Sequence, residues 1–203
     1  MRIRTHTNPL SYTQRFEKIK SSEIFSKYSD TIVLEIGFGQ SSFLLNYAKA
    51  HPQTLAIGVE ARKKAVEAMQ ETVEAQKAAC PNVHLVHGNG YLCLQDMFDD
   101  HSLNEMFIFH PDPWIKRRHQ KRRLMSQEFL DVATHKLTHN GLIHISTDVA
   151  PLWQEIMDMF ARNPQFVLRE NHPFWIDYTT SWHEMCQKQQ RQTFCATFSL
   201  IQK

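Results

Sequence analysis

The chain has 203 residues, of which 23 are Lys or Arg and 21 are Asp or Glu, so its formal net charge is +2. Hydrophobic residues make up 42% of it, which excludes an intrinsically disordered chain, and the length is that of one domain. No apolar run approaches the roughly 20 residues that a membrane-spanning helix needs. The small total charge gives no reason to expect a nucleic acid as partner, although a total carries no information about distribution.

The N-terminal residues are more polar than the rest of the chain. Residues 1–30 carry charges and a weak helical pattern but no apolar segment of the kind that directs secretion, so we expect an N-terminal extension before an α/β domain at 31–203. The four cysteines form no CxxC pair, and we expect reduced thiols in a cytoplasmic protein. A zinc site at His183, Cys186 and Cys195 is less favoured because a paired second half is missing.

From residue 31 onwards, short β-branched runs alternate with amphipathic segments. The expected strands lie at 31–36, 54–59, 83–87, 106–110, 142–147, 166–168 and 193–201. The expected helices begin at Ser41 or Ser42, span 61–79, run from the turn at 88–90 to Met97, and begin again at Ser126 and Pro151.

This order of elements defines a fold class. Strands that alternate with helices predict a mostly parallel, twisted sheet of about seven strands with helices on both faces. Residues 194–200 alternate between apolar and polar side chains, which is typical of a half-buried antiparallel strand at the edge. In a Rossmann-like sheet of this kind ligands bind at the carboxyl ends of the strands, so the residues after each strand are the candidates for a site.

The first two strands end in residues suited to a nucleoside. Gly37 and Gly39 follow the first strand, where glycine lets the backbone turn tightly and approach a ligand. Glu60 ends the second strand, 23 residues after Gly37, and a carboxylate at that place accepts hydrogen bonds from ribose hydroxyls. The pattern does not separate NAD from S-adenosylmethionine, but the chain leaves little room for the substrate domain of a dehydrogenase.

The third and fifth strands end in further polar side chains. Asn89 lies between two glycines, where its amide oxygen either accepts from an adenine amino group or belongs to a plain turn. Asp148 follows the fifth strand and points to the same rim unless it only caps the next helix.

After the fourth strand the sequence reads HPDPWIKRRHQKRR. Prolines on both sides of Asp112 hold the backbone extended, so its carboxylate and the indole of Trp114 are presented rigidly. Trp114 either stacks on a base or packs within the protein. Residues 116–123 contain six cations and no acid, which is typical of a solvated face, a localisation signal or, beside a nucleoside site, a phosphate contact. The other 17 basic and 21 acidic residues sum to −4, so the total conceals one basic edge.

These motifs together resemble one family. The block PDPWIKRRHQKRRL, with LEIGFG, GVE and STD at other strand ends, is similar to the bacterial tRNA (guanine-N7)-methyltransferases over roughly residues 32–160. The resemblance implies a class I methyltransferase domain, S-adenosylmethionine as methyl donor, and methylation of guanine N7 in the variable-loop region of tRNA. The alternatives are an RNA-binding homologue with little or no activity and a methyltransferase for another substrate. We expect no metal and no membrane, and either a monomer or a homodimer.

The resemblance also implies roles for individual residues. Asp112 is the catalytic carboxylate by this resemblance. The residues implied to bind the cofactor are Glu35, Gly37, Gly39, Glu60 and Asn89. The residues implied to contact the RNA are Lys116, Arg117, Arg118, His119, Lys121, Arg122, Arg123, Asp148, Thr180 and Glu184.

Three positions depart from the family pattern. The glycine-rich turn usually reads GFGxG, and Ser41 stands here in place of the last glycine. Asn89 stands where the family usually has Asp. The C-terminal T-x-x-E segment is represented by Thr180 or Ser181 with Glu184, and the glycines that usually come after it are absent. These departures indicate a divergent member.

Overall fold

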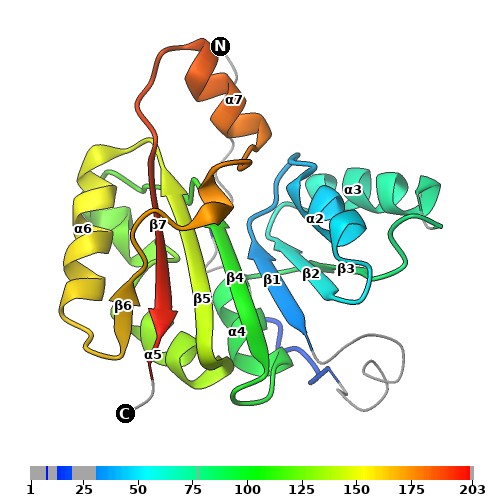
Figure 1. Ribbon diagram of the computed structural model, residues 1–203, viewed down its shortest axis with the longest axis horizontal. Coiled ribbons are helices and arrows are strands. Elements are labelled where there is room, and N and C mark those ends of the chain that lie inside the picture. Colours follow the sequence, from blue (N-terminus) through cyan, green and yellow to red (C-terminus); the bar gives the residue numbers. More distant parts are fainter. Residues whose placement is uncertain (1–7, 9–12, 20–30, 77, 202–203) are drawn as a thin grey trace.

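A seven-stranded mixed sheet forms the centre of the molecule, in the order β3-β2-β1-β4-β5-β7-β6 (Figure 1). The computed structural model describes residues 8, 13–19, 31–76 and 78–201. All strand pairs are parallel except those of β7, which runs antiparallel between β5 and β6. The strands are β1 Ile32–Ile36, β2 Leu55–Glu60, β3 Val83–His87, β4 Leu103–Phe109, β5 Leu137–Thr147, β6 Phe166–Leu168 and β7 Phe194–Leu200.

Helices cover both faces of the sheet. The α-helices are α2 Phe43–Ala50, α3 Lys63–Ala75, α4 Gly90–Met97, α5 Gln127–Lys136, α6 Ala150–Ala161 and α7 Ser181–Lys188, and two 3-10 helices are η2 Arg117–Arg122 and η3 Pro173–Trp175. Buried side chains of α4, α5 and α6 pack with Leu34 and Ile36 of β1. Val33, which points to the other face, packs with α2 and η3. Strand alternation thus builds two apolar layers around one sheet, as the sequence predicted.

Several boundaries differ from their predictions. The helix expected at 61–79 is the shorter α3, which ends at Ala75. Its buried residues are Ala65, Met69 and Val73, so its apolar face stops within the last turn of the helix. The strand expected at 142–147 begins earlier, since Leu137 already pairs with Leu103 before an irregular stretch. Three short helices, η2, η3 and α7, were not predicted, because their sequences lack a long apolar repeat.

The described part of the N-terminal extension, residues 13–19, lies along α4. It contains no helix, so the helical expectation is wrong for these residues, while the rest of 1–30 apart from Asn8 lies outside the described residues. Arg15 Nε donates to Asp96 Oδ2 over 2.7 Å, and the amide of Ile19 donates to the Met97 carbonyl over 2.8 Å. A Cβ at Gly88 would overlap the ring of Phe16, so this packing requires glycine. Among the described helices, none has the length and apolar character needed to cross a bilayer.

We predict that Asn82 is a main stabiliser of the α2–β2 connection. Its buried Nδ2 contacts the carbonyl oxygens of Ala48, His51 and Thr54 at 3.2, 3.0 and 2.7 Å. Asn82→Ala removes the side-chain donor that these three carbonyls share and should lower the free energy of unfolding by about 2 kcal/mol. Urea denaturation measures it, with the exposed Gln70→Ala on α3 as control, expected within about 0.5 kcal/mol of the parent. Equal losses in both variants would contradict the prediction.

Candidate active site

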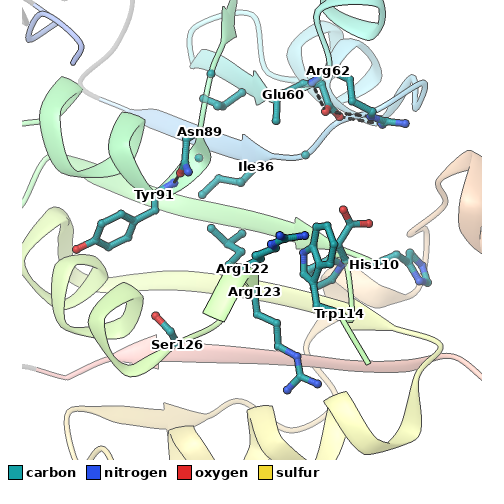
Figure 2. A pocket seen from close by; sticks show the side chains of 18 of the residues that line it. Ile36, Glu60, Arg62, Asn89, Tyr91, His110, Trp114, Arg122, Arg123 and Ser126 are labelled. Carbon is teal, nitrogen blue, oxygen red and sulfur yellow. Dashed lines mark hydrogen bonds and ion pairs between the residues drawn. The ribbon is translucent and has the colours of Figure 1, made fainter. Parts of the chain in front are cut away.

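A cavity of about 490 Å³ opens at the carboxyl ends of β1, β2, β3 and β4 (Figure 2). This is the edge at which the strand order reverses between β1 and β4, where ligands bind in sheets of this class. One wall comes from the ends of β1, β2 and β3, and the opposite wall comes from the segment after β4. The predicted site residues that line it are Gly37, Glu60, Asn89, Asp112, Lys121, Arg122 and Arg123.

The glycine turn after β1 bends back toward β2. Gly37 and Gly39 have φ of 84° and 60°, in the left-handed region that glycine adopts without strain. The amide of Gly37 donates to the Val59 carbonyl over 2.7 Å. The amide of Gly39 donates to Glu60 Oε2 over 3.0 Å. Glu60 is only 5% exposed, so this turn places a buried carboxylate at the cavity wall.

Arg62 holds the same carboxylate from the other side. Its backbone amide and Nε donate to Glu60 Oε1 over 2.8 and 3.1 Å, and Nη2 donates to Oε2 over 2.9 Å. A Cβ at Gly39 would lie 2.9 Å from Nη2, so the missing side chain makes room for the guanidinium. Arg62 was not among the predicted site residues, although its place two residues after Glu60 was a usable signal.

Glu35 lies beside this group and does not line the cavity. It is 2% exposed, and its Oε2 has no hydrogen-bond partner among the described residues. Burial and, to a smaller extent, the nearby Glu60 charge raise the pKa of Glu35 to about 8, and the backbone amide of Leu44 opposes both effects. Glu35 is therefore largely protonated at neutral pH in this state.

Asn89 lines the cavity and also begins α4. Its Oδ1 accepts from the amides of Tyr91 and Leu92 over 2.8 and 3.3 Å. This is an N-cap, which satisfies backbone donors that a helix start leaves unpaired. The side-chain oxygen that the sequence offered to adenine is thus used by the helix, and the side chain fixes the turn at the cavity wall.

The segment after β4 is stiff. His110 and Trp114, on either side of Pro-Asp112-Pro, have φ of 46° and 38°, which few residues other than glycine adopt. Arg122 lies with its guanidinium carbon 5.1 Å from the centre of the Trp114 ring, and its buried Nε has no partner among the described residues. Figure 2 shows Arg122 beside Trp114 within the cavity. Backbone strain of this kind is typical of functional sites.

The basic run divides into two groups. Lys116, Arg117, Arg118 and Lys121 are exposed. Arg123 instead donates from Nε to the Pro113 carbonyl over 2.7 Å and forms an ion pair with Glu155, with only 10% of its side chain exposed. The ring of His119 meets Trp114 edge-on at 5.8 Å. The exposed cations, rather than the whole run, therefore form the open positive surface next to the cavity.

Asp148 lies behind His110, outside the cavity lining. Its Oδ1 accepts from Trp182 Nε1 over 3.0 Å and lies 3.2 Å from His110 Nδ1, and Arg191 forms an ion pair with Oδ2. Burial alone would raise the pKa of Asp148, but the hydrogen bonds of His110 and Trp182 and the charges of His110 and Arg191 hold it well below its usual range. Asp148 therefore ties α7 and the residues after it to the strand ends.

Thr180 and Glu184 belong to the start of α7. Thr180 is 4% exposed, and its Oγ1 accepts from the amide of His183 over 3.1 Å as the N-cap. The hydroxyl of Tyr178 lies 3.5 Å from this Oγ1 and 3.4 Å from His110 Nε2. Thr179 donates to Glu184 Oε1 over 3.4 Å. The structure thus brings Thr180 near His110, through Tyr178, whereas Glu184 pairs locally.

The residues around Asp148 also have the composition of a metal site. His110, Asp148 and Cys186 offer ligand atoms that all lie within 4.8 Å of one another. Arg191 and Trp182 already donate to the Asp148 carboxylate, so a cation would have to displace a guanidinium. Burial raises the pKa of the Cys186 thiol, which disfavours the thiolate that zinc binds. We therefore assign no metal role to these residues.

The strand order, the antiparallel β7 and a cavity at the ends of β1, β2 and β4 define the fold of a class I methyltransferase. The crystal structure of the 16S rRNA methyltransferase KamB has a similar fold. It matches with a TM-score of 0.66 and 14% sequence identity, over 93% of this chain and 96% of that one.

The chain belongs to the tRNA (guanine-N7)-methyltransferase family. The family model described as "Putative methyltransferase" matches residues 29–196. A tRNA (guanine-N(7)-)-methyltransferase of Shewanella amazonensis is 34% identical over 74% of this chain and 62% of its own length. The protein of the same name from Francisella philomiragia is 33% identical over 76% of this chain and 68% of its own length. The chain thus matches about two thirds of the length of these relatives.

We predict that Glu35 makes stability fall as pH rises. Its pKa is 4.5 in an ordinary setting and about 8 in the fold. Between these two values the folded state keeps the proton while the unfolded state loses it, so stability that is fully present below pH 4.5 is lost as pH rises through the folded value. Glu35→Gln stays neutral. Its unfolding free energy relative to the parent should therefore increase between about pH 5 and pH 8, as measured by urea denaturation.

The exposed Glu71→Gln on α3 is the matched control for this measurement, and its difference from the parent should stay constant over the same range. A constant difference for Glu35→Gln as well would show that Glu35 is ionised throughout.

Proposed function

We propose that the protein transfers a methyl group from S-adenosylmethionine to guanine N7 of a tRNA. The observation that carries this proposal is the position of Asp112. Its carboxylate is presented on a proline-flanked, strained segment into the same cavity as the end of β2, and an exposed basic surface adjoins it. A nucleoside site, a rigid carboxylate and a phosphate-binding surface are what such a reaction needs in one place.

The cavity residues suit the proposed cofactor. A volume of about 490 Å³ is in the usual range for a small-molecule site. Glu60 supplies a carboxylate for the ribose hydroxyls, and Ile36 and Val59 supply apolar contact beside the turn that Asn89 fixes. The buried Nε of Arg122 is a donor with no described partner in this wall, which fits a polar ligand group. The cofactor supplies an electrophilic methyl group on a positively charged sulfur.

The chain's part in the chemistry is positioning and electrostatics. Guanine N7 has a lone pair and no proton, so no general base is needed and alignment dominates the rate. The purine becomes positively charged as N7 is methylated, and the Asp112 carboxylate stabilises that charge or holds the N1–H and amino edge of the base. N7 lies in the deep major groove of a paired RNA, so partial unstacking of the base is part of this proposal.

The substrate assignment rests on the family and on the basic surface. The relatives named above are tRNA methyltransferases, and their names supply the tRNA and the N7 position. Lys116, Arg117 and Arg118 are exposed and closely precede Lys121, which lines the cavity, so phosphates of an RNA bound there would come close to them. Backbone contacts of this kind position the RNA, and the cavity selects the base.

Asp112→Ala should lower the rate of methyl transfer about 100-fold or more while tRNA affinity stays within about twofold, because the carboxylate acts on charge that develops in the reaction. The assay incubates unmodified tRNA with labelled S-adenosylmethionine and identifies 7-methylguanosine by nucleoside mass spectrometry. Asp158→Ala, an exposed carboxylate on α6, is the matched control and should keep full activity. Folded parent protein that binds tRNA but yields no 7-methylguanosine would contradict the proposal and favour a non-catalytic RNA-binding protein.

Replacing Lys116, Arg117 and Arg118 together by Ala should weaken tRNA binding and flatten its salt dependence. Each phosphate contact that is lost removes about 0.7 to 0.9 from the slope of log K against log salt. Filter binding at several salt concentrations measures the slope. Lys49→Ala with Arg162→Ala is the control, because these exposed cations lie at the far ends of α2 and α6, which run away from the cavity edge. A slope that is unchanged in the triple variant would place the RNA elsewhere.

A further inference from the structure

The carboxylate of Glu60 is saturated by protein donors. Oε1 accepts from the amide and Nε of Arg62, and Oε2 accepts from the amide of Gly39 and from Nη2 of Arg62. An ionised carboxylate has about four acceptor positions, and all of them are in use. Figure 2 shows the two side chains joined by these bonds at the cavity wall. A ribose therefore cannot add its two hydroxyls to Glu60 as it stands.

The four donors on this carboxylate are not equally mobile. The amide of Gly39 is part of the turn after β1 and is held there by the backbone. The guanidinium of Arg62 is on a flexible side chain that is 42% exposed. If ribose hydroxyls bind to Glu60, the guanidinium is therefore the group that they displace.

A second acceptor for the guanidinium is present at the same cavity. Hydrogen bonding to Glu60 is the main reason that the pKa of Arg62 is raised; burial opposes it, and the charges of Glu60 and Asp112 both add to it. Asp112 is therefore the other carboxylate whose charge acts on the guanidinium. Both carboxylates line the same cavity as Arg62 itself.

We propose that Arg62 is a positioning residue that exchanges carboxylates: it holds Glu60 when the ribose site is empty and turns to Asp112 when ribose hydroxyls occupy Glu60. This inference rests on the proposed function, because it needs a ribose-bearing cofactor. The exchange makes the cofactor's arrival set the orientation of Asp112 before the base is methylated. The guanidinium competes with the cofactor in the first state and supports the reaction in the second.

These two roles predict opposite effects of removing the guanidinium. Without it, ribose no longer displaces a partner from Glu60, and an ion pair of this exposure corresponds to binding that is about fivefold tighter. Asp112 loses its orienting partner, so kcat should fall about tenfold. A residue with a purely structural role would weaken both binding and turnover.

The test measures binding of S-adenosylhomocysteine by calorimetry and kcat by methyl transfer, for the parent protein, Arg62→Ala and Arg62→Lys. Thermal melts confirm folding, and Arg62→Gln replaces Arg62→Ala if that variant does not fold. Lys64→Ala, an exposed cation two residues further along, is the control and should change neither quantity. We expect tighter binding with slower turnover in Arg62→Ala, and partial recovery of kcat in Arg62→Lys because the ammonium group also pairs with Asp112.

Weaker or unchanged binding in Arg62→Ala would overturn the competition with ribose. Tighter binding with an unchanged kcat would overturn the exchange with Asp112. If the folded parent protein does not bind S-adenosylhomocysteine, the proposed function itself fails and the inference fails with it, so the two failures are distinguishable.

Discussion

Parallel pairing of β1 with both β2 and β4 is the constraint on which the site depends. It brings the carboxyl ends of three strands to one edge, so residues more than twenty positions apart along the chain share one cavity. The turn after β1 then reaches Glu60 at the end of β2 through the Gly39 amide. The proline-flanked segment after β4 brings Asp112 to the opposite wall. No local element contains more than one of these parts.

Two buried carboxylates at this edge of the sheet each form an ion pair with an arginine. Glu60 is held by Arg62, and Asp148 is held by Arg191 together with Trp182. A buried charge needs a partner, because the desolvation cost of an unpaired one is several kcal/mol or more. Ligand binding at such a carboxylate is therefore an exchange of partners. The cations of residues 116–123 differ for the same reason. Arg123, which is mostly buried, pairs with Glu155, whereas its exposed neighbours are open to an RNA.

Most of the fold was predictable from the sequence. All seven strands were expected, because β-branched runs bounded by turns are strong local signals, and the antiparallel strand was predicted from its alternation. The end of α3, the early start of β5 and the helices η2, η3 and α7 were not. Their limits depend on pairing and packing with distant residues, such as Leu137 with Leu103. Residue type at a single position carries no such information.

The site shows the same division. By itself the sequence determined which residue types stand at the strand ends, the basic character of residues 116–123 and the resemblance to one methyltransferase family, because these are properties of order and spacing. Only the tertiary structure decided which of those side chains face the cavity. In the structure Glu35 is buried near the charge of Glu60, Asn89 caps α4, and Glu60 pairs with Arg62. The physical reason is that buried polar groups must find partners in space, and some of those partners come from distant segments: Gly39, 21 residues away, donates to Glu60, and Arg191, 43 residues away, pairs with Asp148.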